Sequence, residues 1–176
     1  MAFATDYKNL SDLMAQGEYE LVISDAYEDA ARTSGTPFIL LLLVVRNDIE
    51  QQYQNKAIWH RMYLSDAALP YSERRMNTIS KCVGLPEGME FESYDHWCNT
   101  VRGLPIRAYV NHREFNGDTS EDIRNFRTSK TPECKHVWKD DKGAGTRRIQ
   151  GRMEYTSTTR QVAPPKPKVD VDQLPF

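Results

Sequence analysis

Aromatic rings and a cation alternate along residues 56–64 in a way that suits nucleic-acid binding. Trp59, Arg61 and Tyr63 share one parity, and the residues between them are mostly apolar. Because successive side chains of a β-strand point to opposite faces, we expect a strand with an apolar core face and an aromatic, cationic outer face. Flat rings stack on bases while a guanidinium group meets phosphate. The alternative assignment places Trp59 and Tyr63 on the core face.

Residues 104–115 repeat this pattern. Arg107, Tyr109 and Arg113 share one parity, and apolar side chains fill most of the other. Two strands with the same outer face predict neighbouring ribbons that present one binding surface. Tyr109 would stack on a base, and the two arginines would contact phosphates. Three further basic residues would extend the phosphate track: Arg124, Arg127 and Lys130.

Hydrophobic periodicity and turn residues predict five strands with helix between the third and the fourth. The strands are expected at residues 18–27, 38–46, 51–65, 104–115 and 123–127. The run at 38–46 is apolar on both parities, which predicts a central strand covered on both faces. One helix is expected to begin at a Ser72 cap and to stop at Gly84, and a second to begin at a Ser93 cap and to end at Gly103.

This element order predicts a mostly β fold with some α. Three strands, a helical insertion and two more strands are the order of the OB-fold, a five-stranded Greek-key barrel that commonly binds oligonucleotides on one face. Other α+β folds share the same content, so the order alone leaves them open. A turn at Asn116-Gly117 is expected to join the last two strands.

Charge divides the chain into three parts. Residues 1–138 hold 15 Lys+Arg against 20 Asp+Glu, a net charge of −5, and are expected to form the folded domain. Residues 139–168 hold 8 basic and 3 acidic residues, a net charge of +5, and are predicted to form a flexible, proline-containing linker. Residues 169–176 form an acidic tip, and most of the tail is predicted to be disordered. A net-acidic domain requires a defined basic groove to bind a polyanion.

Location in a reducing cytoplasm, here of a bacterial host cell, is expected from three further features. The N-terminus lacks the basic-then-apolar pattern of a signal peptide, and no apolar run is long enough to span a bilayer. The 3 cysteines are odd in number and widely spaced, which disfavours a disulfide framework.

The last residues resemble the C-terminal peptide of bacterial single-stranded DNA-binding proteins. Two aspartates precede an apolar residue, a proline and a terminal phenylalanine; the residues concerned are Asp170, Asp172, Leu174, Pro175 and Phe176. The resemblance implies a docking peptide for replication and recombination proteins. This tip departs from the strongest form of the motif, because a valine separates its two aspartates and a glutamine precedes the leucine.

Residues 17–126 also resemble a phage-encoded family once described as a domain of unknown function. The likeness covers the strand–helix–strand order and the Gly-x-Tyr entry at Gly17 and Tyr19. It implies an OB-fold and sequence-independent binding of single-stranded DNA in phage replication, recombination or repair. A homo-oligomer or a cooperative array on DNA would fit this role.

Other functions remain open from the sequence. A strand-annealing recombination mediator would use the same binding face. An enzyme is not expected, since glycine-rich phosphate loops, zinc-protease motifs and nucleophile elbows are missing, but a metal-dependent nuclease would need only convergent carboxylates. Cysteine and histidine pairs suggest a zinc site. Only one residue separates the members of each pair, however, whereas the ligands of structural zinc sites are usually separated by two to four residues. Neither a metal nor another cofactor is therefore expected. The residues concerned are Cys82, His96, Cys98, Cys134 and His136.

Overall fold

The computed structural model describes residues 13–64 and 69–138, which form one five-stranded antiparallel sheet and two helices. The elements are β1 (Gly17–Ala30), β2 (Pro37–Val45), β3 (Ala57–Tyr63), α1 (Leu69–Cys82), α2 (Tyr94–Val101), β4 (Pro105–Phe115) and β5 (Asp118–Arg127). The strand order is β3-β2-β1-β4-β5. The predicted linker at 139–168 and the tip at 169–176 lie outside the described residues.

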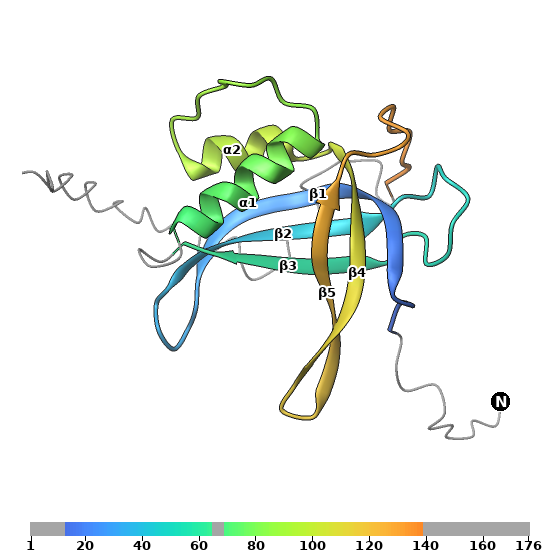
Figure 1. Ribbon diagram of the computed structural model, residues 1–176, viewed down its shortest axis with the longest axis horizontal. Coiled ribbons are helices and arrows are strands. Elements are labelled where there is room, and N and C mark those ends of the chain that lie inside the picture. The colour runs from blue at the N-terminus through green and yellow to red at the C-terminus, as the bar shows by residue number, and fades with distance from the viewer. Residues whose placement is uncertain (1–12, 65–68, 139–176) are drawn as a thin grey trace, which may run out of the picture.

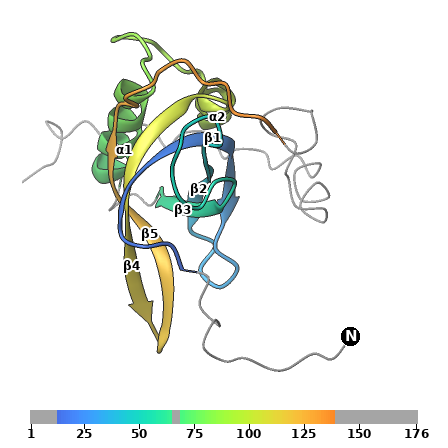
Figure 2. The same ribbon diagram turned by 90° about the vertical axis from the view of Figure 1, so that its right-hand side faces the viewer.

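β1 organises the sheet because it pairs on both of its edges. Leu21 lies opposite Val45 of β2 on one side and Ile106 of β4 on the other. The pairing with β2 shifts register at Ser24, and such bulges increase the local twist of a strand. The sheet therefore curls strongly, and the β4–β5 ribbon crosses in front of β2 and β3 (Figure 1, Figure 2).

The core fills the space between the inner face of this curled sheet and the two helices. Ile23, Leu41 and Ile106 are fully buried from three strands. Trp97 of α2 is 1% exposed, and its indole Nε1 donates a 2.9 Å hydrogen bond to Ser80 Oγ of α1. The two helices are thus fixed to each other as well as to the sheet.

β2 is covered on both faces, as its sequence predicted. Every residue from Phe38 to Val45 is buried, including those that point away from the core. A strand without a solvent face needs no polar alternation, which explains its continuous apolar run.

The sequence predicted a closed barrel, whereas the sheet is unclosed. The edge strands β3 and β5 are not hydrogen-bonded neighbours within the described sheet. Side chains join them instead. The Lys56 ammonium lies 2.7 Å from a Glu121 carboxylate oxygen, and the rings of His60 and Phe126 meet edge to face at 5.3 Å. Bulky side chains thus hold these edges together without a backbone ladder; we call this line of contact the β3–β5 seam.

Several predicted boundaries differ from those observed. β3 begins at Ala57 rather than at residue 51, because Tyr53 and Asn55 adopt positive φ angles of 60° and 67° that end any extended run. α1 begins before Ser72, whose hydroxyl donates to the carbonyl of Tyr63 instead of capping the helix. The second cap was predicted correctly, since Ser93 Oγ accepts from the amide of His96 at 3.1 Å.

The last hairpin is longer than predicted. β5 starts at Asp118 instead of residue 123, and the turn at Asn116 and Gly117 is where the sequence placed it. Both turn residues have positive φ, 51° and 83°, which Asn and Gly tolerate best. The hairpin extends well beyond the body of the sheet (Figure 1).

No helix in the described part of the chain is long and apolar enough to cross a membrane.

Candidate nucleic-acid interface

The aromatic and cationic face of β3 points outward. Trp59 and Tyr63 are 40% and 44% exposed, and Arg61 is exposed between them. Their alternate neighbours Ile58 and Met62 are buried in the core. The alternative assignment, with the two rings inside, is therefore wrong, while the binding role of this face stays a prediction.

Phe38 of β2 holds two of these side chains in place. It lies opposite Tyr63 across the β2–β3 ladder, and their ring centroids are 5.6 Å apart in an edge-to-face arrangement. The Arg61 guanidinium carbon lies 5.3 Å from the centre of the same phenylalanine ring, a cation–π distance. Side chains ordered in this way lose less conformational freedom when a ligand binds.

His60 points the other way, into the β3–β5 seam. It is 4% exposed, and its Nε2 lies 2.9 Å from Arg75 Nη1 of α1. Arginine only donates hydrogen bonds, so Nε2 accepts and the ring is neutral, with its proton on Nδ1, which faces the Asp122 carboxylate at 4.0 Å. Burial, reinforced by the Arg75 charge and opposed by Asp122, lowers the pKa of His60 to about 4.

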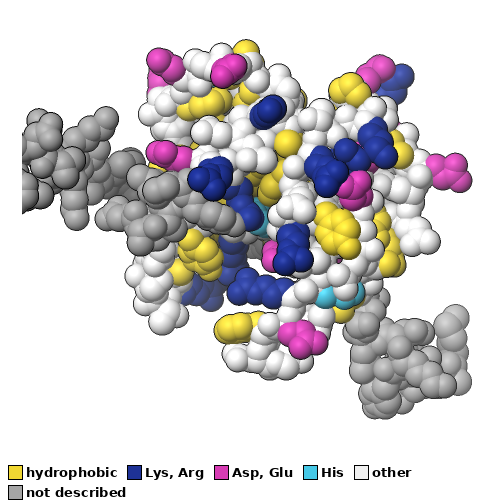
Figure 3. Space-filling view, in the orientation of Figure 1, with side chains coloured by type: hydrophobic (Ala, Val, Ile, Leu, Met, Phe, Trp, Pro, Cys, Tyr) yellow, Lys and Arg dark blue, Asp and Glu magenta, His cyan; other side chains and the backbone are white. Residues whose placement is uncertain are grey.

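A basic groove of about 220 Å³ lies beside this histidine, between α1 and β5. Its lining residues are Arg74, Arg75, Thr78, Arg124, Asn125 and Phe126. We call it the α1–β5 groove. A neighbouring hollow on the exposed side of α1 contains Glu73 and Lys81 as well as Arg74. Dark-blue basic side chains gather over this region in the space-filling view (Figure 3).

Sequence reasoning missed the two arginines of α1 that line the groove. The sequence predicted this helix but assigned it no part in binding. The consecutive pair Arg74-Arg75 was a signal that could have pointed to a basic surface on it. Only the packing of α1 against β5 shows that this pair faces Arg124.

The β4 face differs from the prediction in two ways. β2 and β1 separate β3 from β4 within the sheet, and β5 lies on the other side of β4, so the two ribbons are not neighbours. Glu18 also pairs with two of the predicted phosphate contacts, at 2.9 Å from Arg107 and 3.3 Å from Arg127. Glu18 lies opposite Tyr109 across the β1–β4 ladder, and Arg107 opposite Arg127, which brings all three charges together.

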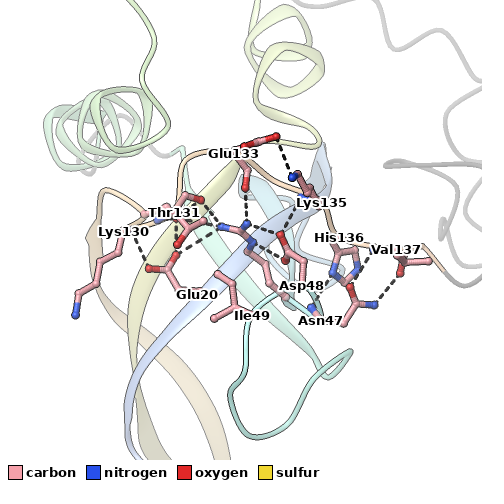
Figure 4. Close-up of polar contacts among 12 residues, drawn as sticks. Glu20, Asn47, Asp48, Ile49, Lys130, Thr131, Glu133, Lys135, His136 and Val137 are labelled. Atoms are coloured by element: carbon pink, nitrogen blue, oxygen red, sulfur yellow. Dashed lines mark hydrogen bonds and ion pairs between the residues drawn. The ribbon is translucent and has the colours of Figure 1, made fainter.

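The remaining predicted residues are spread over this side of the sheet. Tyr109 is half-buried, opposite Asn125 of the groove. Arg113 is exposed near the tip of the last hairpin, and Arg124 lines the groove. The Lys130 side chain is exposed and extends away from the sheet, while its backbone amide donates to a Glu20 carboxylate oxygen at 2.9 Å (Figure 4).

A buried arginine fixes the segment that carries Lys130 (Figure 4). The Arg46 side chain has no exposed surface and donates to both carboxylate oxygens of Asp48, at 2.9 and 2.6 Å. It also donates to Ser129 Oγ at 3.1 Å, and to the carbonyls of Thr131 and Glu133 at 2.7 and 2.9 Å. The chain after β5 is therefore attached to the end of β2.

Asp48 is the nearer of the two carboxylates that face Arg46, at 2.6 Å, and Glu20 lies 3.9 Å away. The hydrogen bond from Arg46 is the largest of the effects that lower the pKa of Asp48, from its ordinary value of 3.8 to about 2. The backbone amide of Lys135 adds a further 2.8 Å hydrogen bond to the same carboxylate.

The cysteines and histidines considered for zinc lie on three segments: Cys82 on α1, His96 and Cys98 on α2, and Cys134 and His136 after β5. Cys98 is buried in the core, and this burial raises its pKa to about 12. His136 Nδ1 accepts a 3.2 Å hydrogen bond from the amide of Asn47. Among the residues that the structure describes, no three His, Cys, Asp or Glu side chains are grouped so that they could hold a metal ion.

Comparison with known proteins adds one match. A family model described as "Protein of unknown function (DUF669)" matches residues 3–135, which is most of the chain and all of the described strands and helices. No curated protein matches the sequence.

Proposed function

Since the chain belongs to the DUF669 family of proteins of unknown function, we propose from its geometry that it binds single-stranded DNA without sequence preference. One observation carries the proposal. Trp59, Arg61 and Tyr63 all project to solvent from β3, although each is flanked by buried residues. Exposed rings that alternate with a cation offer stacking and phosphate contact together, and stacking tolerates every base.

The fold of the domain is consistent with this proposal. We propose that the curled sheet is an open variant of the OB-fold, in which the first strand pairs with the second and the fourth. The two helices between β3 and β4 fit the helical insertion of that fold. In this proposal the β3–β5 seam takes the place of the ladder that would close the barrel.

The cellular role that we propose is protection of exposed strands during phage replication or recombination. We propose that the C-terminal tip recruits partner proteins. Leu174 and Phe176 would fill an apolar pocket on the partner, and the two aspartates would contact basic residues of the partner around that pocket. Deletion of residues 169–176 is expected to abolish partner capture. DNA binding by the described domain should survive the deletion.

Binding of oligo-dT and of duplex DNA by the full chain, measured across a salt series, tests the function. We expect oligo-dT to bind more tightly than duplex, because bases stacked inside a duplex cannot reach the rings of β3. Affinity should fall linearly with the logarithm of salt concentration, with a slope of about −0.7 for each phosphate neutralised. Equal affinity for both forms would contradict the proposal. Cleavage of the labelled strand in Mg²⁺ would show a nuclease, and accelerated pairing of complementary strands would show an annealing protein.

A further inference from the structure

The α1–β5 groove is lined by cations without a carboxylate among them. Three guanidinium groups, those of Arg74, Arg75 and Arg124, line one hollow of about 220 Å³. Like charges that converge in this way repel one another and weaken the fold unless an anion joins them. Two acids of the described residues lie outside the groove: Asp122 faces His60, and Glu73 lines the neighbouring hollow.

The arginines of the groove are held differently from Arg107 of β4 and Arg127 of β5. Within the described part of the chain, the side chains of Arg74 and Arg124 have no ion-pair partner, whereas Glu18 pairs with both Arg107 and Arg127. The guanidinium of Arg75 is oriented by its hydrogen bond to the buried His60.

The groove and the exposed rings of β3 lie on opposite faces of that strand. Phe126 of the groove packs against His60, which points away from the face that carries Trp59 and Arg61. Asn125 lies opposite Tyr109 across the β4–β5 ladder. A DNA strand that stacks on the rings of β3 must therefore pass over the edge of β3 to reach the groove.

We propose that the α1–β5 groove binds about two neighbouring backbone phosphates of the single strand, through Arg74 and Arg124 with Arg75 between them. This inference rests on the proposed function and changes the path of the strand. The phosphates pass along α1, not along the paired arginines of β4 and β5. The occupant is a polynucleotide, because the groove is open and offers cations without any pocket for a base.

The test compares the R74Q/R124Q variant of the full chain with the wild type, using oligo-dT from 0.05 to 1 M salt. Loss of two phosphate contacts should make the salt slope shallower by about 1.4. That difference corresponds to about 25-fold weaker binding at 0.1 M salt and to nearly equal binding at 1 M. Both side chains are solvent-accessible, so the variant should fold, and the loss of repulsion between them should leave its thermal midpoint equal to or slightly above that of the wild type.

Two further variants complete the test. R32Q removes one charge from the β1–β2 turn, outside the groove, and should weaken binding less than threefold. R74K/R124K keeps both charges and should restore most of the salt slope. If the wild type binds oligo-dT while R74Q/R124Q behaves like R32Q, the groove is not the phosphate site although the proposed function stands. If the wild type does not bind oligo-dT, both proposals fall.

Discussion

Replacement of Asp48 by asparagine should destabilise the domain by about 2–3 kcal/mol. Asp48 is the carboxylate that receives two hydrogen bonds from the fully buried Arg46 side chain. Removing one partner of a buried pair commonly costs about 3–5 kcal/mol, because the remaining charge is left uncompensated. Ser129 and two backbone carbonyls still accept from Arg46 in the variant, so we expect a smaller loss.

The pH dependence of stability gives this prediction a second readout. The pKa of Asp48 is lowered in the folded state, from 3.8 to about 2, so the ionised form stabilises the fold. That contribution is complete above about pH 4 and is lost as the pH falls through about 2. After allowance for solvent screening it amounts to about 1–2 kcal/mol. In D48N this part of the acid dependence should disappear.

Urea unfolding of D48N and wild type between pH 7 and pH 2 measures both effects. E133Q is the matched control, because Glu133 lies in the same segment but its ion pair with Lys135 is exposed. Such pairs contribute little, so E133Q should differ from wild type by less than about 0.5 kcal/mol. A D48N variant that is as stable as E133Q, with an unchanged acid dependence, would refute our account of the Arg46 network.

Three further outcomes are expected. E18Q should release the two guanidinium groups that Glu18 pairs with, yet change oligo-dT binding less than threefold at 0.1 M salt, as measured by fluorescence anisotropy, because the proposed phosphate path follows α1; a several-fold gain would place those groups on the DNA path. S93A should cost about 1 kcal/mol in urea unfolding through loss of the α2 cap, and a value near zero would show that the cap is dispensable. L41A should cost about 3–5 kcal/mol in the same assay, because Leu41 is fully buried in the central sheet, and a loss below 1 kcal/mol would contradict the assigned core.

Local periodicity predicted the parts of this fold that depend on neighbouring residues. The two-residue repeat around Trp59 indicated which side of β3 faces solvent, and the unbroken apolar run indicated that β2 is covered on both faces. The Ser93 cap and the Asn116-Gly117 turn were also predicted correctly, since each depends on a backbone requirement within a few residues.

Contacts between residues far apart in the sequence could not be predicted from local periodicity. Arg46 looked like the end of a strand, yet its partners Ser129 and Glu133 lie 83 and 87 residues further along the chain. Glu18 was expected only to begin the first strand, whereas strand pairing brings it close to both Arg107 and Arg127. The same limit explains the α1–β5 groove and the unclosed seam, both of which depend on how the curled sheet brings its edges together.

Binding of oligo-dT by W59A and W59F at 0.1 M salt tests the central claim most directly. Each stacked ring contributes about 1–3 kcal/mol per base, so W59A should bind roughly 5- to 150-fold more weakly than wild type. W59F keeps an aromatic ring and should remain within a fewfold of wild type. Because stacking involves no phosphate, the salt slope should be the same in all three proteins. If W59A binds as tightly as wild type, the outer face of β3 is not where the DNA lies.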